Sequence, residues 1–231
     1  MKKILLILFI IFLPLTAWAH QPRLVEMQTN IKIQNPDISQ AFYGYLNGQP
    51  VVYEIKTDQP LNLLVSILIP DLSYATKDLT TKVYRDKIDR KTLLFTLDGT
   101  KFEWTKYYEE YGGDNYWQGP EEKRKVDPGT YLVQIFRPSN IGPYVLVVGQ
   151  KEDFPPNEML KTILILPKLK IFFDKSPFLA FFNMIGLYIL GALVAILVVI
   201  GLIIFLIKKV IKFFKRGKIV KQKLKKNKLK S

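Results

Sequence analysis

Aromatic side chains are concentrated in residues 102–120, where they stand among acidic and amide residues. Such rings are a usual platform for a sugar ring or a protein partner, because aromatic faces contribute a large contact area at a low entropy cost. The alternative is that they fold back onto the domain as a satellite cluster of its core. The candidate ligand-binding residues are Trp104, Tyr107, Tyr108, Tyr111, Tyr116 and Trp117.

Catalytic and metal-binding chemistry has few candidates in this chain. It contains one histidine, His20, and no cysteine, so a zinc cluster, a Cys/His pair and a Ser-His-Asp triad are not expected. Copper binding at His20 would need a second imidazole. The adjacent pairs Glu109-Glu110 and Glu121-Glu122 are typical of a solvated loop, because acid/base work on a glycoside needs two carboxylates facing each other across a cleft. We therefore predict a protein that is not an enzyme, with no cofactor and no metal.

Charge is distributed unevenly over the 231 residues. There are 34 Lys and Arg against 20 Asp and Glu, which gives a formal net charge of +14. The excess lies at the two ends beside apolar runs, whereas residues 20–177 are formally neutral. This distribution is typical of membrane topology rather than of a basic groove for phosphates, so no nucleic-acid partner is expected.

The N-terminus has the parts of a secretory signal. Lys2 and Lys3 precede an apolar run, and Ala17-Trp18-Ala19 has the small residues of a cleavage site. We predict that residues 1–19 are a signal peptide and that the mature chain starts at His20. The alternative is an uncleaved anchor helix, for which the apolar run is short.

Residues 178–207 carry no charge and are numerous enough to cross a bilayer as one helix. Residues 208–231 then carry twelve basic residues and no acidic residue, and the positive-inside rule places such a tail in the cytoplasm. We predict a single-pass protein of the bacterial inner membrane with its N-terminal domain outside.

The basic tail is expected to begin as an amphipathic helix on the inner leaflet, held there by anionic lipids. Residues 218–230 are expected to be too polar to fold alone. The predicted membrane-surface residues are Lys208, Lys209, Lys212, Lys215 and Arg216.

Residues 20–150 are expected to form an all-β extracytoplasmic domain. Short runs rich in β-branched or aromatic residues are separated by turn formers, without the crossover helices of an α/β fold. These runs are residues 51–56, 61–69, 93–97, 131–136 and 144–148. The pattern predicts an antiparallel β-sandwich of the jelly-roll or immunoglobulin-like kind. Asp98-Gly99 is expected to form a tight hairpin turn.

Residues 151–177 are predicted to be a linker and a juxtamembrane amphipathic segment. The apolar residues after Asn157 are consistent with a helix on the outer membrane face, capped by Asn157 and broken at Pro167. Another strand followed by a loop is the alternative. A run this apolar next to a membrane span favours contact with lipid or with a partner's transmembrane region.

The end of the β domain resembles bacterial pre-peptidase C-terminal domains. Residues 127–135 (DPGTYLVQI) and 142–148 (GPYVLVV) are similar to that family's closing strands, and residues 51–55 and 63–67 to its two opening strands. The likeness spans residues 49–149. It implies a β-sandwich accessory module without catalytic activity, which sometimes binds calcium. In this chain the acidic residues Asp71, Asp78, Asp86 and Asp89 are interleaved with Lys and Arg.

Together these features predict a membrane-anchored, non-catalytic binding or assembly module that docks to a membrane or envelope protein. The first alternative is a surface carbohydrate-binding module that holds a glycan with the aromatic residues of 102–120. The second is a glycoside-acting enzyme that uses the carboxylates of the same region.

Overall fold

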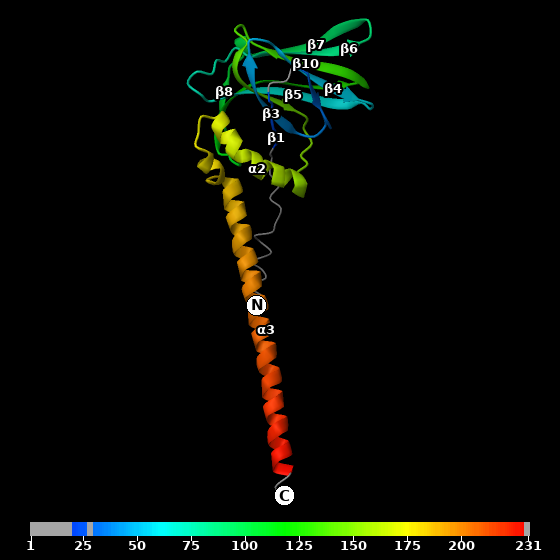
Figure 1. Ribbon diagram of the computed structural model, residues 1–231. Helices are drawn as coiled ribbons and strands as arrows, with labels where there is room; N and C mark the ends of the chain where they lie inside the picture. The colour runs from blue at the N-terminus through cyan, green and yellow to red at the C-terminus, as the bar shows by residue number, and fades with distance from the viewer. Residues whose placement is uncertain (1–19, 27–29, 229–231) are drawn as a thin grey trace. The chain divides into compact units, whose positions relative to one another are not determined.

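The computed structural model describes residues 20–26 and 30–228 of the chain (Figure 1). The predicted signal peptide, residues 1–19, lies outside the described residues. The chain divides into two compact units. Thr16–Gly186 contains both sheets and the helical segments that follow them, and the other unit contains the long C-terminal helix from Leu187 onward.

Two sheets face each other and form a β-sandwich, as the sequence predicts (Figure 1). The six-stranded sheet has the order β1-β3-β11-β5-β9-β8, and the five-stranded sheet has the order β2-β4-β10-β6-β7. The strands of the first sheet are β1 (Gln21–Leu24), β3 (Gln40–Asn47), β5 (Leu61–Pro70), β8 (Thr105–Glu109), β9 (Asp114–Val126) and β11 (Ile141–Val148). Those of the second are β2 (Asn30–Ile33), β4 (Val51–Thr57), β6 (Thr80–Lys87), β7 (Arg90–Asp98) and β10 (Gly129–Phe136).

The sheets are mixed rather than purely antiparallel. β1 runs parallel to β3, and β2 runs parallel to β4, whereas the other paired strands are antiparallel. Each parallel strand lies at the edge of its sheet and comes from residues 20–33, which the sequence analysis did not identify as strands. Their shortness explains this, since a run of four residues carries little periodicity.

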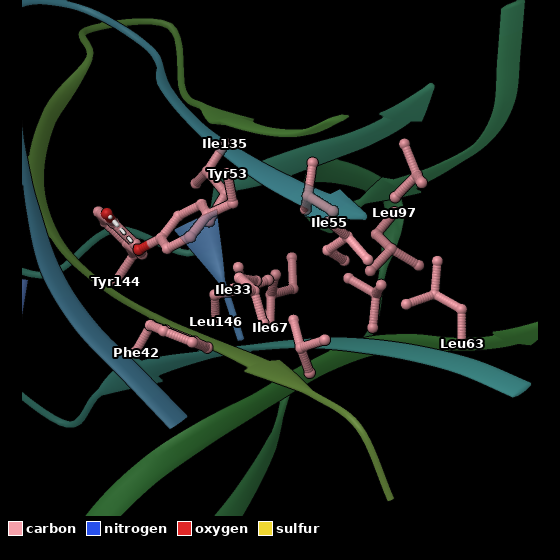
Figure 2. Packing of buried hydrophobic residues seen from close by; sticks show 14 of the residues in the cluster. Ile33, Phe42, Tyr53, Ile55, Leu63, Ile67, Leu97, Ile135, Tyr144 and Leu146 are labelled. Carbon is pink, nitrogen blue, oxygen red and sulfur yellow. Dashed lines mark hydrogen bonds between the residues drawn. The ribbon is translucent and has the colours of Figure 1, made fainter. Parts of the chain in front are cut away.

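The main core lies between the two sheets (Figure 2). β10 shows how the sequence produces it, because Tyr131, Val133 and Ile135 are buried while the alternate residues are half-buried. A strand turns successive side chains to opposite faces, so this period of two directs one face inward. Tyr53 of β4 and Tyr144 of β11 meet inside the core, and their hydroxyls form a hydrogen bond of 2.9 Å. Burial raises the pKa of Tyr144 to about 12.

β5 and β11 are apolar on both faces, unlike β10. In β11, Tyr144, Leu146 and Val148 belong to the core between the sheets. Val145 and Val147, on the other face, belong to a second hydrophobic cluster. Strands that are covered on both faces have continuous apolar runs instead of alternation. The six-stranded sheet is therefore the middle layer of three.

The third layer is helical. It consists of α2 (Pro156–Phe172) and the short 3-10 helix η2 (Pro177–Phe181). The sequence predicts a helix that is capped by Asn157 and broken at Pro167. Instead, α2 begins at Pro156 with Pro155 as its N-cap, so Asn157 lies inside the helix, and α2 runs through Pro167. Leu166 and Leu169 on either side of it are buried against the sheet, and this packing offsets the hydrogen bond that proline cannot make.

The long helix α3 (Met184–Lys228) begins later and ends later than predicted. Residues 178–183 were assigned to the membrane span, but most of them belong to η2 and to the turn after it. Residues 218–228 were expected not to fold alone, but they continue α3. A helix that has already started adds each further residue at little cost, which explains this continuation.

Two expectations about residues 98–122 are wrong in detail. Asp98-Gly99 does not form a hairpin, because the chain passes there from β7 in one sheet to β8 in the other through the 3-10 helix η1 (Gly99–Lys101). Asp98 caps η1 by accepting a hydrogen bond from the backbone N–H of Thr100 at 3.1 Å. The solvated loop expected for Glu109-Glu110 and Glu121-Glu122 is not formed either, because β8 ends at Glu109 and pairs with β9, which contains Glu121 and Glu122.

The hydrogen bond between Tyr53 and Tyr144 gives a test of the core. Tyr53→Phe leaves the Tyr144 hydroxyl buried without its partner, which costs about 1–3 kcal/mol of unfolding free energy. The double variant Tyr53→Phe/Tyr144→Phe is expected to recover most of that loss, because neither hydroxyl is then stranded. Denaturant unfolding of the detergent-solubilised chain measures both. Tyr45→Phe, which breaks an exposed hydrogen bond to Tyr74, is the control and should change little. Additive losses in the double variant would contradict the assignment.

Candidate membrane-proximal site

α2 lies on the outer face of the six-stranded sheet (Figure 1). Leu166 and Leu169 of the helix, with Phe173 at its C-terminal cap, are buried there. The ring of Phe173 meets Tyr116 at a centroid distance of 5.1 Å, and Tyr116 shares a 2.9 Å hydrogen bond with the hydroxyl of Tyr43. The strand residues of this second cluster are Ala41, Tyr43, Leu68, Tyr116, Val145 and Val147.

Asp114, the first residue of β9, lies buried between two lysines. Lys170 Nζ donates to its Oδ2 at 2.7 Å, and Lys175 Nζ donates to its Oδ1 at 2.7 Å. Only 2% of the Lys170 side chain and 4% of the Asp114 side chain are exposed. Both lysines also donate to the preceding turn, Lys170 to the carbonyl of Gly112 and Lys175 to that of Gly113. The network ties the end of α2 to the turn between β8 and β9, because a buried charge needs its partner.

Glu109, the last residue of β8, stabilises the turn between β8 and β9 through hydrogen bonds to its backbone. Its two carboxylate oxygens accept hydrogen bonds from the backbone N–H of Tyr111 at 2.9 Å and of Gly112 at 2.6 Å. Burial raises the pKa of the Glu109 carboxyl above its ordinary value, the two backbone donors oppose that rise, and the neighbouring Asp114 adds to it. Glu109 therefore has a structural position and is not part of a solvated loop.

Asn183 links the same turn to the start of α3. Its Nδ2 donates to the carbonyls of Gly112 and Ala180, both at 2.9 Å. Its Oδ1 accepts from the backbone N–H of Gly186 at 3.0 Å, which is the hydrogen bond of a helix N-cap. A Cβ at Gly186 would lie 1.7 Å from the carbonyl oxygen of Phe181, so this close approach requires glycine. The residues that lead into α3 are thus bonded to the sandwich.

The N-terminal part of α2 is held by a second ion cluster. Arg23 of β1 pairs with Glu158 at 2.9 Å, and Lys161 pairs with the same carboxylate at 2.6 Å. The hydrogen bond from Lys161, followed by that from Arg23, lowers the pKa of Glu158. Both ends of α2 are therefore fixed to the sandwich by ionic contacts.

The side of α2 and η2 that the sheet does not cover is apolar and exposed. We call this surface the outer apolar face. Its members are Met159, Leu160, Leu164, Ile171, Phe178, Leu179, Phe181 and Phe182. A patch of this kind is uncommon on a protein surrounded by water and marks an interaction surface.

The six aromatic residues that the sequence singles out do not share one surface. Trp104 is buried in the core between the sheets, where its Nε1 donates to the carbonyl of Gly99 at 2.7 Å. Its ring lies so close to Gly99 and Gly119 that a Cβ on either would come within 2.6 Å of it. Tyr116 is buried on the other face of the sheet, beneath α2. These two residues serve two different cores.

The remaining four aromatic residues are only partly available. Trp117 is half-buried, its Nε1 donates to Asp71 at 2.8 Å, and Lys77 Nζ lies 3.1 Å from the ring centroid. Tyr107 and Tyr108 are exposed on β8, but successive strand residues point to opposite faces. Tyr111 is half-buried in the turn. The structure therefore brings no broad aromatic platform together on this hairpin.

The other candidates for chemistry are separated or engaged. Among residues 20–26 and 30–228, no group of three or more His, Cys, Asp or Glu side chains is placed to hold a metal ion. His20 Nδ1 forms a hydrogen bond with Ser39 Oγ. Glu122 pairs with Arg124 at 2.9 Å.

α3 provides the candidate membrane span. Its segment Met184–Lys215 has a mean hydropathy of 3.3 in its most apolar window, and it is the one helix in the described part of the chain that is long and apolar enough to cross a membrane. Lys208, Lys209, Lys212 and Lys215 lie exposed in its C-terminal part, and Arg216 follows in the same helix. Their binding to anionic lipid stays a prediction.

The residues that join the helical layer to the sandwich are not evident from the sequence, above all Asp114, Lys170 and Asn183. A polar or charged residue in a turn or in an apolar segment does not indicate, from its neighbours alone, which distant residue it will contact. A signal for the helical layer itself was present, because the uninterrupted apolar runs of β5 and β11 indicate a sheet that is covered on both faces.

Replacing Asp114 tests whether its ion pairs with Lys170 and Lys175 hold the end of α2 on the sandwich. Asp114→Asn leaves Lys170 buried without its counter-charge, and removing one partner of a buried ion pair costs about 3–5 kcal/mol of stability. We expect faster amide hydrogen exchange in α2 and a lower denaturation midpoint. Glu122→Gln breaks an exposed pair worth about 0–1 kcal/mol and is the matched control. Equal effects of the two variants would show that Asp114 does not hold α2.

The raised pKa of Glu109 predicts a pH dependence. Between the ordinary pKa and the raised folded-state pKa, the folded chain binds more protons at this site than the unfolded chain. Its contribution to stability is therefore largest below that interval and is lost as the pH rises through the folded pKa. Glu109→Gln removes the titrating carboxyl, so the unfolding free energy of this variant should change less with pH between the ordinary and the raised pKa of Glu109. Glu121→Gln, at an exposed position, should keep the wild-type profile. An unchanged slope in Glu109→Gln would count against the burial of this carboxyl.

Comparison with known proteins finds a likeness among solved structures. No protein-family model and no curated protein matches the chain. Among solved structures, the chain is similar to the pre-peptidase C-terminal domain of collagenase from Bacillus anthracis, with a TM-score of 0.31 and 10% sequence identity. The match covers 56% of this chain and 95% of that domain. This is the kind of domain that residues 49–149 resemble in sequence.

Proposed function

We propose that the chain is a membrane-anchored, non-catalytic binding or assembly module, which holds its β-sandwich outside the cytoplasm and docks it to a membrane or envelope protein. The observation that carries this proposal is the connection between sandwich and span. α2 and η2 are folded onto the six-stranded sheet, and Asn183 both bonds to the sandwich and caps the helix that contains the candidate span. A domain built in this way is suited to being held at a membrane surface.

The orientation follows from charge. Twelve basic residues and no acidic residue follow the apolar part of α3, whereas residues 20–177 are formally neutral. Basic residues next to a membrane span stay on the cytoplasmic side, so the sandwich lies on the other side. The signal-like N-terminus supports the same orientation and the bacterial inner membrane as the location.

A non-catalytic role is supported by what the ionisable groups do. The single histidine is hydrogen-bonded to Ser39, Glu109 caps its own turn, and Asp114 is enclosed by two lysines. General acid/base catalysis needs such groups free to exchange a proton with a substrate. Because the aromatic residues of 102–120 lie on different faces, we propose no carbohydrate-binding function beside the docking role.

Membrane topology gives the first test. The chain lacks cysteine, so a single introduced thiol reports one site. In spheroplasts, a membrane-impermeant maleimide should label Ile88→Cys, at the fully exposed tip of the β6–β7 hairpin. It should label Ser231→Cys only after the membrane is permeabilised. Labelling of Ser231→Cys in intact spheroplasts, or recovery of the chain in solution without detergent, would overturn the proposal.

Partner docking needs a separate experiment. The full chain, purified in mild detergent at its native expression level, is expected to bring down one membrane or envelope protein identifiable by mass spectrometry. Glycan-array binding that is lost in Trp117→Ala would instead support a carbohydrate-binding module. Turnover of a glycoside that is lost in Glu121→Gln would support an enzyme.

A further inference from the structure

α2 is apolar on two opposite sides, and the sandwich covers only one of them. Leu166 and Leu169 are buried against the six-stranded sheet. Leu160, Leu164 and Ile171 form a separate exposed stripe at helical spacing, and Leu164 is 77% exposed. A helix that is hydrophobic all round belongs in an apolar environment on every side. The exposed stripe therefore needs a cover that the sandwich does not supply.

η2 extends this exposed surface with aromatic side chains. Ala180 is completely buried and anchors η2 to the second cluster. Phe178 and Phe182 lie two positions before and two positions after Ala180 in the sequence, and they are 84% and 83% exposed.

The charges around the outer apolar face suit a lipid surface. Lys168 lies exposed along α2, and its long side chain allows the ammonium group to reach phosphate while the stem stays in an apolar layer. Glu158, an acidic residue of α2, is buried and paired with Arg23 and Lys161. An apolar stripe flanked by lysines is the composition of helices that lie at the boundary between headgroups and acyl chains.

The short sequence distance to the candidate span favours the lipid bilayer as the cover of the outer apolar face. The candidate span begins at Met184, two residues after Phe182. We propose that the outer apolar face seats in the outer leaflet of the same bilayer that α3 crosses, so that α2 and η2 lie at the headgroup boundary. This inference rests on the proposed membrane anchoring. It assigns the surface to lipid rather than to the transmembrane region of a partner protein.

Contact of the outer apolar face with lipid would also determine which sheet of the sandwich faces the membrane. The opposite side of α2 packs on the six-stranded sheet, so that sheet lies on the membrane side of the sandwich. The five-stranded sheet and the β6–β7 hairpin are then turned away from the lipid.

Depth-dependent quenching tests the seat directly. Single cysteines are introduced at Leu164, Phe178, Ile88 or Leu193, labelled with the fluorophore NBD, and the full chain is placed in nanodiscs of phosphatidylethanolamine and phosphatidylglycerol that contain shallow nitroxide-labelled lipids. All four side chains are exposed in the folded chain, so labelling should preserve the fold. NBD at Leu164 and Phe178 is expected to be blue-shifted and quenched, and NBD at Ile88 to be neither. Leu193, within the candidate span, reports insertion of α3 with deep nitroxides.

The outcomes separate this inference from the proposed function. Quenching at Leu193 without quenching at Leu164 and Phe178 would overturn the lipid seat and leave membrane anchoring intact. No quenching at Leu193 would overturn the anchoring itself. If the two face positions are unquenched in nanodiscs but shielded from maleimide in native membranes, a protein rather than lipid covers the face.

A matched pair of variants gives a second readout. Leu160→Asp/Leu164→Asp places two charges on the outer apolar face and should reduce quenching at a Phe178 reporter, because carboxylates are expelled from the acyl region. Ile88→Asp/Leu93→Asp changes two exposed apolar residues of the five-stranded sheet region and should leave that quenching unchanged. Equal quenching in both variants would contradict the proposal. Circular dichroism checks that the sheet content is retained.

Discussion

The six-stranded sheet has two apolar faces, and each must be kept from water. The five-stranded sheet covers one face, and α2 with η2 covers the other. Removal of apolar surface from water is the main favourable contribution to folding, so the helical layer is part of the domain and not a tether that follows it. The chain therefore reaches the candidate membrane span from a folded layer.

Ionic contacts determine the position and orientation of α2 on the sheet. Hydrophobic burial is not directional, and by itself it would allow α2 to slide or reverse on the sheet. The pairing of Lys170 with Asp114 at one end and of Glu158 with Arg23 at the other fits a single placement. A buried ion pair adds little net stability compared with apolar residues, but a misplaced charge costs much. We interpret the two clusters as the reason that α2 has one register.

Local pattern was sufficient for much of the fold. The β-sandwich class, the runs of β4, β5, β7, β10 and β11, a helix between the sandwich and the span, and the long apolar helix all follow from periodicity and turn chemistry. β3 was missed because Gly44 interrupts its apolar pattern. In the folded chain, that glycine leaves room for the Tyr144 ring, since a Cβ there would lie 2.4 Å from the tyrosine hydroxyl. A close approach between two strands cannot be deduced from one of them.

At the candidate site, the features set by the sequence and those set by the tertiary structure separate more clearly. The sequence by itself determined what depends on neighbouring residues: the uncharged span, the concentration of lysine after it, and an apolar segment before it. Only the tertiary structure decided where the aromatic residues of 102–120 point, which side of α2 is covered, and that Lys170 meets Asp114 across 56 positions of sequence. The physical reason is that charge and hydropathy are summed along the chain, whereas burial is set by which distant segments pack together.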